Sequence, residues 1–261
     1  MNRLTELFQS DKRDLLSIYF TAGFPLLEDT ISIAEAVEKA GADLIEIGMP
    51  YSDPIADGPT IQMANDQALA NGMTIRKLFE QLADLRKKVS IPVLLMGYFN
   101  PVYQFGVDAF CRKCSEVGVD GLIIPDMPLW EYETQWQSVL ESHGLFNIFL
   151  VTPQTPENRI RQIDSLSKAF IYLVSSASVT GSRSEISTDQ EAYFKRIVAM
   201  KLQNPGLIGF GISNQETFQQ ASKHGRGAII GSAFIQVLKD LPVRSDLNRM
   251  EPISCFIESI K

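Results

Sequence analysis

One glutamate stands inside a short apolar segment, at a position where an apolar residue is expected. Residues 43–48 read Asp-Leu-Ile-Glu-Ile-Gly, which is typical of a buried β-strand. Side chains alternate along a strand, so Glu46 shares one face with Leu44, while Ile45 and Ile47 share the other. If the isoleucines pack against covering helices, the carboxyl group points into the interior, where burial raises its pKa. Such a group can give and take a proton near neutral pH, although a glutamate held in a structural hydrogen-bond network would look the same.

Two aspartates follow in a loop that is rich in proline. Residues 49–59 contain three prolines together with Asp53 and Asp57. Proline restricts the conformations of the loop, so both carboxylates can be positioned before a substrate arrives. Asp-Pro and Asp-Gly pairs also favour turns, so both acids could simply be turn formers. The residues alone leave these two interpretations open for each aspartate.

Glycines at the ends of later apolar segments predict a binding site for a phosphate group. Residues 209–213 read Gly-Phe-Gly-Ile-Ser, and Gly231 precedes Ser232 at the start of a predicted helix. Free backbone N–H groups and a hydroxyl at a helix start can hold an anion without any lysine or arginine. We therefore expect phosphate to bind at Gly181, Gly211, Gly231 and Ser232, unless these glycines only make tight turns.

The residue types that covalent amine chemistry and metal chemistry require are missing from the expected positions. A Schiff-base enzyme needs a lysine on a strand or at its upper end, but Lys168 lies at the opposite end of its strand. The two histidines, His143 and His224, each directly precede a glycine at the predicted end of a helix. Cys111 and Cys114 lie within a predicted helix and fit structural thiols better than a metal or redox site. Carboxylate acid/base chemistry remains, and no metal is expected.

The rest of the chain alternates between apolar segments of strand length and amphipathic helices. Eight apolar segments can be recognised, at residues 15–21, 43–48, 92–98, 121–125, 147–151, 170–175, 207–211 and 228–231. Helical periodicity follows at residues 30–40, 75–88, 107–117, 130–142, 156–165, 189–202, 215–223 and 232–239. Continuous apolar strands that alternate with helices indicate a parallel sheet covered on both faces.

Eight such units predict an α/β fold of the (β/α)₈ TIM-barrel type, with an open doubly wound sheet as the alternative. We expect one domain over residues 1–261, with an extra N-terminal helix at residues 4–9 and a trailing helix at residues 246–260. Enzymes with this barrel carry their chemistry at the carboxyl ends of the strands. Glu46, the two loop aspartates and the glycines that end the later apolar segments all fall at the carboxyl ends of the strands.

The composition excludes some classes of partner. The net charge of -7 argues against nucleic acid, which requires a basic surface. No apolar run approaches the roughly 20 residues that cross a bilayer, so no membrane interaction is expected. The first residues are amphipathic and resemble neither a secretory signal nor a transit peptide. We therefore expect a cytoplasmic protein.

The segment that carries the three acids resembles a known family. Residues 45–62 read Ile-Glu-Ile-Gly-Met-Pro-Tyr-Ser-Asp-Pro-Ile-Ala-Asp-Gly-Pro-Thr-Ile-Gln and closely resemble the signature of tryptophan synthase alpha chains. Other segments similar to the family occur in family order across nearly the whole chain, at residues 19–23, 95–101, 179–181, 209–213 and 231–233. Two positions depart from the pattern: Tyr51 replaces a usual Phe, and Ser178 replaces a glycine that many members have before Val-Thr-Gly.

The resemblance implies a lyase that cleaves indole-3-glycerol phosphate into indole and glyceraldehyde 3-phosphate by a retro-aldol reaction. Glu46 would shuttle the protons, and Asp57 would accept a hydrogen bond from the indole N–H. Tyr172 would orient the site, or be only a core residue. The indole ring would lie in an apolar cavity formed by Tyr19, Met96 and Phe210.

The resemblance also implies a partner and no cofactor in this chain. The partner is a β subunit that depends on pyridoxal phosphate and receives the indole, in an α₂β₂ heterotetramer. Asp53 and Thr180, in the loops after the second and sixth strands, could hydrogen-bond when both loops close and so couple the subunits. Two other functions stay open at this point: a phosphate-binding isomerase with the same barrel, and a regulatory subunit without activity.

Overall fold

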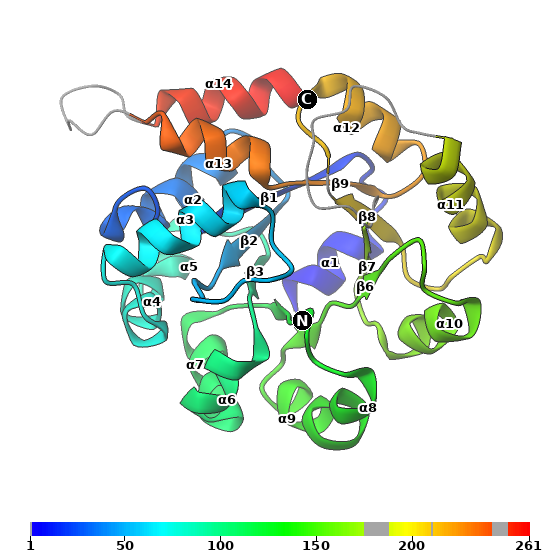
Figure 1. Ribbon diagram of the computed structural model, residues 1–261, viewed down its shortest axis with the longest axis horizontal. Helices are drawn as coiled ribbons and strands as arrows, with labels where there is room; N and C mark the ends of the chain where they lie inside the picture. Colours follow the sequence, from blue (N-terminus) through cyan, green and yellow to red (C-terminus); the bar gives the residue numbers. More distant parts are fainter. Residues whose placement is uncertain (1, 175–187, 210, 242–249) are drawn as a thin grey trace.

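A sheet of parallel strands forms the centre of the molecule (Figure 1). The computed structural model describes residues 2–174, 188–209, 211–241 and 250–261. Within these ranges the strands form one sheet in the order β5-β4-β3-β2-β1-β9-β8-β7-β6. Their bounds are β1 (Leu15–Thr21), β2 (Leu44–Gly48), β3 (Val93–Met96), β4 (Gly121–Ile123), β5 (Phe146–Asn147), β6 (Leu150–Val151), β7 (Ile171–Val174), β8 (Gly206–Gly209) and β9 (Gly227–Ile230).

The two end strands of this order, β5 and β6, are two parts of one chain segment. The first part pairs with β4, and the N–H of Ile148 continues that pairing by donating to the carbonyl of Leu122 at 2.8 Å. The second part pairs with β7, where the N–H of Tyr172 donates to the carbonyl of Phe149 at 2.9 Å. The segment therefore joins both edges and closes the sheet into a barrel of eight strand positions. The predicted barrel is confirmed, and the open sheet is wrong.

The interior of the barrel is filled by apolar side chains and closed at one end by helix α1 (Arg3–Gln9). Leu4 of this helix is fully buried, and the ring of Phe8 stacks on Phe170 with centroids 4.9 Å apart. The side chain of Asn2 caps the helix by accepting from the N–H of Leu4 at 2.9 Å. Figure 1 shows α1 in the centre of the ring of strands. This is the predicted N-terminal helix, and its packing leaves the other end of the barrel for the site.

Helices surround the barrel (Figure 1). Most occupy the predicted ranges, because their apolar stripes face the outward side chains of the strands. Two helices, α3 and α6, were not predicted. The bounds are α2 (Thr30–Lys39), α3 (Pro59–Ala70), α4 (Ile75–Leu82), α5 (Leu85–Lys88), α6 (Phe99–Phe105), α7 (Val107–Val117), α8 (Leu129–Glu131), α9 (Gln137–Ser142), α10 (Glu157–Leu166), α11 (Thr188–Ala199), α12 (Gln215–Ser222), α13 (Ser232–Lys239) and α14 (Glu251–Ile260), with a 3₁₀ turn at Leu27–Asp29 and a π turn at Tyr132–Trp136.

The alternation predicted for the second strand is observed. Ile45 and Ile47 belong to the core between the strands and the surrounding helices, whereas Leu44 belongs to the core inside the barrel.

Cys111 and Cys114 are buried on α7 in the outer core, as predicted for structural thiols. Among the described helices, none combines the length and the apolar character needed to span a membrane.

Candidate active site

Glu46 lies on β2 with its side chain inside the barrel and no exposed surface. The hydroxyl of Ser17 on β1 donates to its Oε1 at 2.8 Å, and Oε2 has no hydrogen-bond partner among the described residues. Burial raises the pKa of Glu46 from 4.5 to about 8, against the lowering effect of the Ser17 hydrogen bond. The group can therefore hold or release a proton near neutral pH, with one oxygen left for another molecule.

Asp57 lies in the loop between β2 and α3 and is half-buried. Its N–H donates to the carbonyl of Pro54 at 3.0 Å, and its carbonyl accepts from Gln62 at 2.9 Å, so the residue does form a turn. Burial raises the pKa of its carboxyl group from 3.8 to about 6, while hydrogen bonds from Tyr98 and Asn65 lower it. The turn thus holds the Asp57 carboxyl group in the loop after β2, and with a pKa of about 6 this group is mostly ionised at neutral pH.

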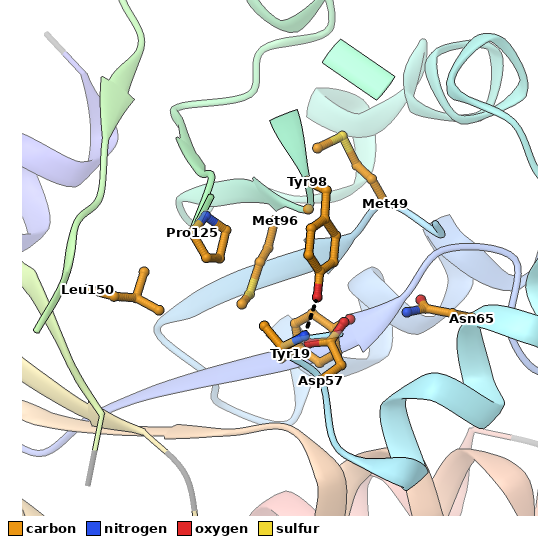
Figure 2. A pocket seen from close by; sticks show the side chains of 10 residues that line it. Tyr19, Met49, Asp57, Asn65, Met96, Tyr98, Pro125 and Leu150 are labelled. Atoms are coloured by element: carbon orange, nitrogen blue, oxygen red, sulfur yellow. Dashed lines mark hydrogen bonds between the residues drawn. The ribbon is translucent and has the colours of Figure 1, made fainter. Parts of the chain in front are cut away.

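The Asp57 side chain opens into a cavity at the carboxyl ends of β1, β2 and β3 (Figure 2). Met96, Pro125 and Leu150 line it opposite the carboxylate, giving the cavity one apolar wall and one polar wall. The full lining consists of Tyr19, Met49, Ala56, Asp57, Asn65, Met96, Gly97, Tyr98, Pro125 and Leu150. The structure therefore brings the predicted residues Tyr19, Met96 and Asp57 together.

Two buried tyrosines lie near Glu46, and one of them, Tyr19, also lines the cavity. Tyr19 on β1 is paired in register with Glu46, and burial raises its pKa, as do the carboxylates of Asp57 and Glu46. Tyr172 on β7 is buried in the inner core, and burial, followed by the charge of Glu46, raises its pKa well above the usual value. Both phenols thus stay protonated near the acids.

Each of these tyrosines needs a glycine beside it. A Cβ at Gly48 would lie 2.3 Å from the hydroxyl oxygen of Tyr19, and a Cβ at Gly209 would lie 2.3 Å from that of Tyr172. Any larger residue at the ends of β2 and β8 would therefore push a phenol out of place. Gly48, at the end of β2, therefore makes room for the Tyr19 phenol.

The predicted phosphate residues lie at the ends of the last two strands. Gly231 follows β9 and precedes α13, and Ser232 is the first, exposed residue of that helix. A Cβ at Gly231 would stand 3.4 Å from the Tyr19 ring, so this helix start lies beside the cavity. Gly211 follows β8 with φ +80°, a conformation that favours glycine. Gly181 and Phe210 lie outside the described residues.

The loop residues predicted to couple the subunits are only partly described. Asp53 is exposed in the loop after β2 and accepts a hydrogen bond from Ser52. Thr180 lies outside the described residues, as does the unusual Ser178. The other unusual residue, Tyr51, packs its ring against Tyr98 with centroids 5.1 Å apart. That replacement therefore borders the cavity.

Several cavity residues were not predicted, and Tyr98 and Asn65 are the most informative. Tyr98 is the last residue of the third predicted strand, at the end where the barrel fold concentrates functional groups, so its position was a usable signal. Asn65 lies on α3, a helix that was not predicted, so nothing in the sequence pointed its side chain toward Asp57.

The closed barrel with two carboxylates at the carboxyl end of its strands defines a (β/α)₈-barrel enzyme. The family model described as "Tryptophan synthase alpha chain" matches residues 6–258. The chain belongs to the tryptophan synthase alpha chain family, which confirms the resemblance found in the sequence.

Individual relatives give the same assignment. The tryptophan synthase alpha chain of Flavobacterium johnsoniae is 58% identical over 240 residues, covering 92% of this chain and 94% of its own. That of Flavobacterium psychrophilum is 56% identical over 260 residues, covering 100% of both chains. The crystal structure of the alpha chain from Legionella pneumophila superposes with a TM-score of 0.87 at 31% identity, covering 100% of this chain and 96% of that one. Tryptophan synthase from M. tuberculosis, in an aminoacrylate-bound form, gives a TM-score of 0.85 at 28% identity, covering 100% and 98%.

Proposed function

We propose that Glu46 and Asp57 are the residues with which this chain cleaves indole-3-glycerol phosphate. The chain is a carbon–carbon lyase of tryptophan biosynthesis, as its family and its relatives at 50–58% identity indicate. A phosphate-binding isomerase is therefore the wrong class. The roles of the individual side chains are our assignment.

The observation that carries this assignment is the difference between the two carboxyl groups. At neutral pH a pKa of about 8 keeps Glu46 mostly protonated, whereas a pKa of about 6 leaves Asp57 mostly ionised. A pair of acids whose environments separate their pKa values in this way can divide the acid and the anionic roles. Glu46 is then ready to donate a proton, and Asp57 is ready to stabilise positive charge.

The reaction follows from these two states. Glu46 protonates C3 of the indole ring, which turns the ring into an electron sink with positive charge on its nitrogen. Asp57 accepts a hydrogen bond from the indole N–H and stabilises that charge. The Glu46 carboxylate then takes the proton from the hydroxyl on the carbon bonded to C3, and the bond between these two carbons breaks. Its electrons restore the indole ring, an aldehyde leaves as glyceraldehyde 3-phosphate, and Glu46 is protonated again.

We assign the indole ring to the apolar side of the cavity. Tyr19 and Met96 line the same cavity as Asp57, which supports their role, and the closeness of Tyr172 to Glu46 supports an orienting role for its phenol. Phe210 is assigned by family resemblance. For the phosphate group, the position of Gly231 beside Tyr19 supports the set that the sequence predicts, namely Gly181, Gly211, Gly231 and Ser232.

The chain works with the β subunit of tryptophan synthase, as expected for a member of the alpha chain family. We propose an α₂β₂ assembly in the cytoplasm, in which the alpha chain itself is one domain without a cofactor. We also propose that Asp53 and Thr180 couple closure of the two active-site loops to binding of the β subunit.

The decisive experiment measures indole release from indole-3-glycerol phosphate by the purified chain, with and without the β subunit. We expect slow release by the alpha chain alone and faster release in the complex. Absence of indole in both samples, with the substrate bound, would mean a regulatory subunit without activity and would overturn the proposal.

A further inference from the structure

Tyr98 occupies a rigid position at the junction between β3 and α6. The preceding residue, Gly97, is held by β4, because its N–H donates to the carbonyl of Ile123 at 3.0 Å. On the other side, the N–H of Phe99 donates to the carboxylate of Asp126 at 2.8 Å. The Tyr98 ring is buried and packs against Tyr51. The phenol therefore has a fixed direction, and Figure 2 shows its hydroxyl aimed at the loop after β2.

The hydroxyl of Tyr98 meets that loop at two adjacent residues. It accepts a hydrogen bond from the N–H of Ala56 at 2.9 Å. A hydroxyl carries one proton of its own, which is left to be donated to the carboxylate of Asp57. Burial and the charge of Asp57 raise the pKa of Tyr98 to about 12, so the phenol keeps this proton over the working range of the enzyme. One side chain thus ties the loop backbone and the loop carboxylate together.

The surroundings of Asp57 make this hydrogen bond important. The titratable groups that face it are the neutral phenols of Tyr19, Tyr98 and Tyr172, with Glu46 deeper in the barrel. Asn65 approaches the carboxylate from α3. Burial favours the neutral acid, and within the described part of the chain the hydrogen bonds from Tyr98 and Asn65 are what lowers its pKa. Asp57 therefore depends on neutral hydrogen-bond donors to stay ionised.

We propose that Tyr98 is a positioning residue whose hydroxyl holds Ala56 and the Asp57 carboxylate as one unit and so sets the lower pH limit of the lyase reaction. The proposal rests on the proposed role of Asp57 as the anion beside the indole nitrogen. Asn65 on α3 supports the same ionised state of Asp57. Tyr98 itself does not take part in proton transfer.

The test is the pH dependence of indole release by the complex with the β subunit, in wild type and Tyr98→Phe. Phe keeps the ring and its packing but removes the hydroxyl. Activity should rise with pH as Asp57 ionises, and loss of a hydrogen bond to a charged group should move this rise upward by about one pH unit. At pH 6 the variant should lose about fivefold relative to wild type, and near pH 7.5 less than about twofold.

Two further variants give the control and an independent check. Tyr103→Phe makes the same change at a tyrosine on α6 that is 58% exposed, and its profile should match wild type. Asn65→Ala removes the other donor to Asp57 and should move the acid limb in the same direction as Tyr98→Phe. An equal loss of activity of Tyr98→Phe at every pH, or an acid limb of Tyr98→Phe that does not move, overturns the proposal.

Asp57→Asn separates this inference from the proposed function. If Asp57→Asn keeps full activity, the role given to Asp57 is wrong and the proposed function fails. If Asp57→Asn is inactive while Tyr98→Phe keeps the wild-type pH profile, only the inference about Tyr98 fails.

Discussion

Replacing Glu46 with glutamine should separate the activity of this chain from its stability. The amide keeps the shape of the side chain and can still accept the hydrogen bond from Ser17, now 2.8 Å from Glu46 Oε1. It cannot donate a proton to the indole ring or take one from the substrate hydroxyl. Since general acid/base groups contribute about 10²–10⁴-fold, we expect Glu46→Gln to lower kcat by that factor and to leave substrate binding largely intact.

The same variant should be more stable than wild type at high pH. In the unfolded chain Glu46 ionises near 4.5, whereas burial raises its pKa to about 8 in the folded chain. Between these values the folded state binds more protons than the unfolded state, so the free energy of unfolding falls as the pH rises. One pKa unit corresponds to about 1.4 kcal/mol, so Glu46 destabilises the fold at pH 8 by roughly 4 kcal/mol at most. Buried amide N–H groups without a partner cost about 1–3 kcal/mol. The expected net effect is therefore a gain of roughly 2 kcal/mol at pH 8 and a loss of roughly 1 kcal/mol at pH 5.

The assay has a kinetic part and a stability part. Indole release and substrate binding are measured at neutral pH, and urea unfolding is measured at pH 5 and pH 8 for each protein. Glu80→Gln is the matched control, because that side chain is 69% exposed and the change should affect neither readout. Turnover above about a tenth of wild type in Glu46→Gln would refute the proton-transfer role. A stability difference that is the same at both pH values would refute the burial argument.

Three other variants test the remaining parts of the site. Asp57→Asn should lower indole release steeply, because a neutral amide stabilises a cationic indole less than a carboxylate does; a fall in turnover with unchanged substrate binding would support this. Ser232→Asp should weaken substrate binding by placing an anion beside the phosphate, and an unchanged dissociation constant would move the phosphate site elsewhere. Asp53→Ala should mainly reduce activation by the β subunit, measured as indole release with and without saturating β subunit; equal activation of both proteins would rule out the Asp53–Thr180 latch.

The strands and most helices could be predicted from the sequence because burial imposes a regular pattern on them. β1 was predicted at its observed bounds, since a mostly apolar run of seven residues, all buried, follows the polar residues 10–14. The fifth strand was predicted as one run, but its first half pairs with β4 and its second half with β7. Closure of the barrel decides where the pairing changes, and apolar patterning carries no information on that.

The two helices that were missed have sequences that hide their periodicity. α3 begins with Pro59 and mixes apolar and polar residues around its axis, with only Ala64, Asn65 and Ala68 buried. α6 is short and contains Pro101 within its first turn, where proline is tolerated although it resembles a loop signal. In both cases tertiary packing against the barrel outweighs the weak local signal.

The candidate site could be predicted where a residue breaks a local pattern or where the family resemblance assigns it a role. Glu46 was found because a carboxyl group in an apolar strand is unusual, whereas the residues alone left Asp57 open and the family resemblance assigned its role. Tyr98 and Asn65 act through a carboxylate that reaches them only after the chain folds. The strand-end position of Tyr98 points to the site and Asn65 carries no such signal, but for both residues the contact with Asp57 depends on tertiary geometry that a single sequence does not display.

The different roles of the two acids follow from their places in the barrel. Glu46 projects from a strand into the interior, where the Ser17 hydroxyl donates to it and burial is the main influence on its pKa. Asp57 lies on a loop at the rim, where it is less buried and where it can be reached by donors from the junction after β3 and from α3. The strand position therefore produces a proton donor and the loop position an anion, from two carboxyl groups of similar intrinsic acidity. Exchanging Glu and Asp between these positions would therefore preserve both charge states. The reaction would still fail, because the acid on β2 would be one methylene shorter and would not reach the substrate.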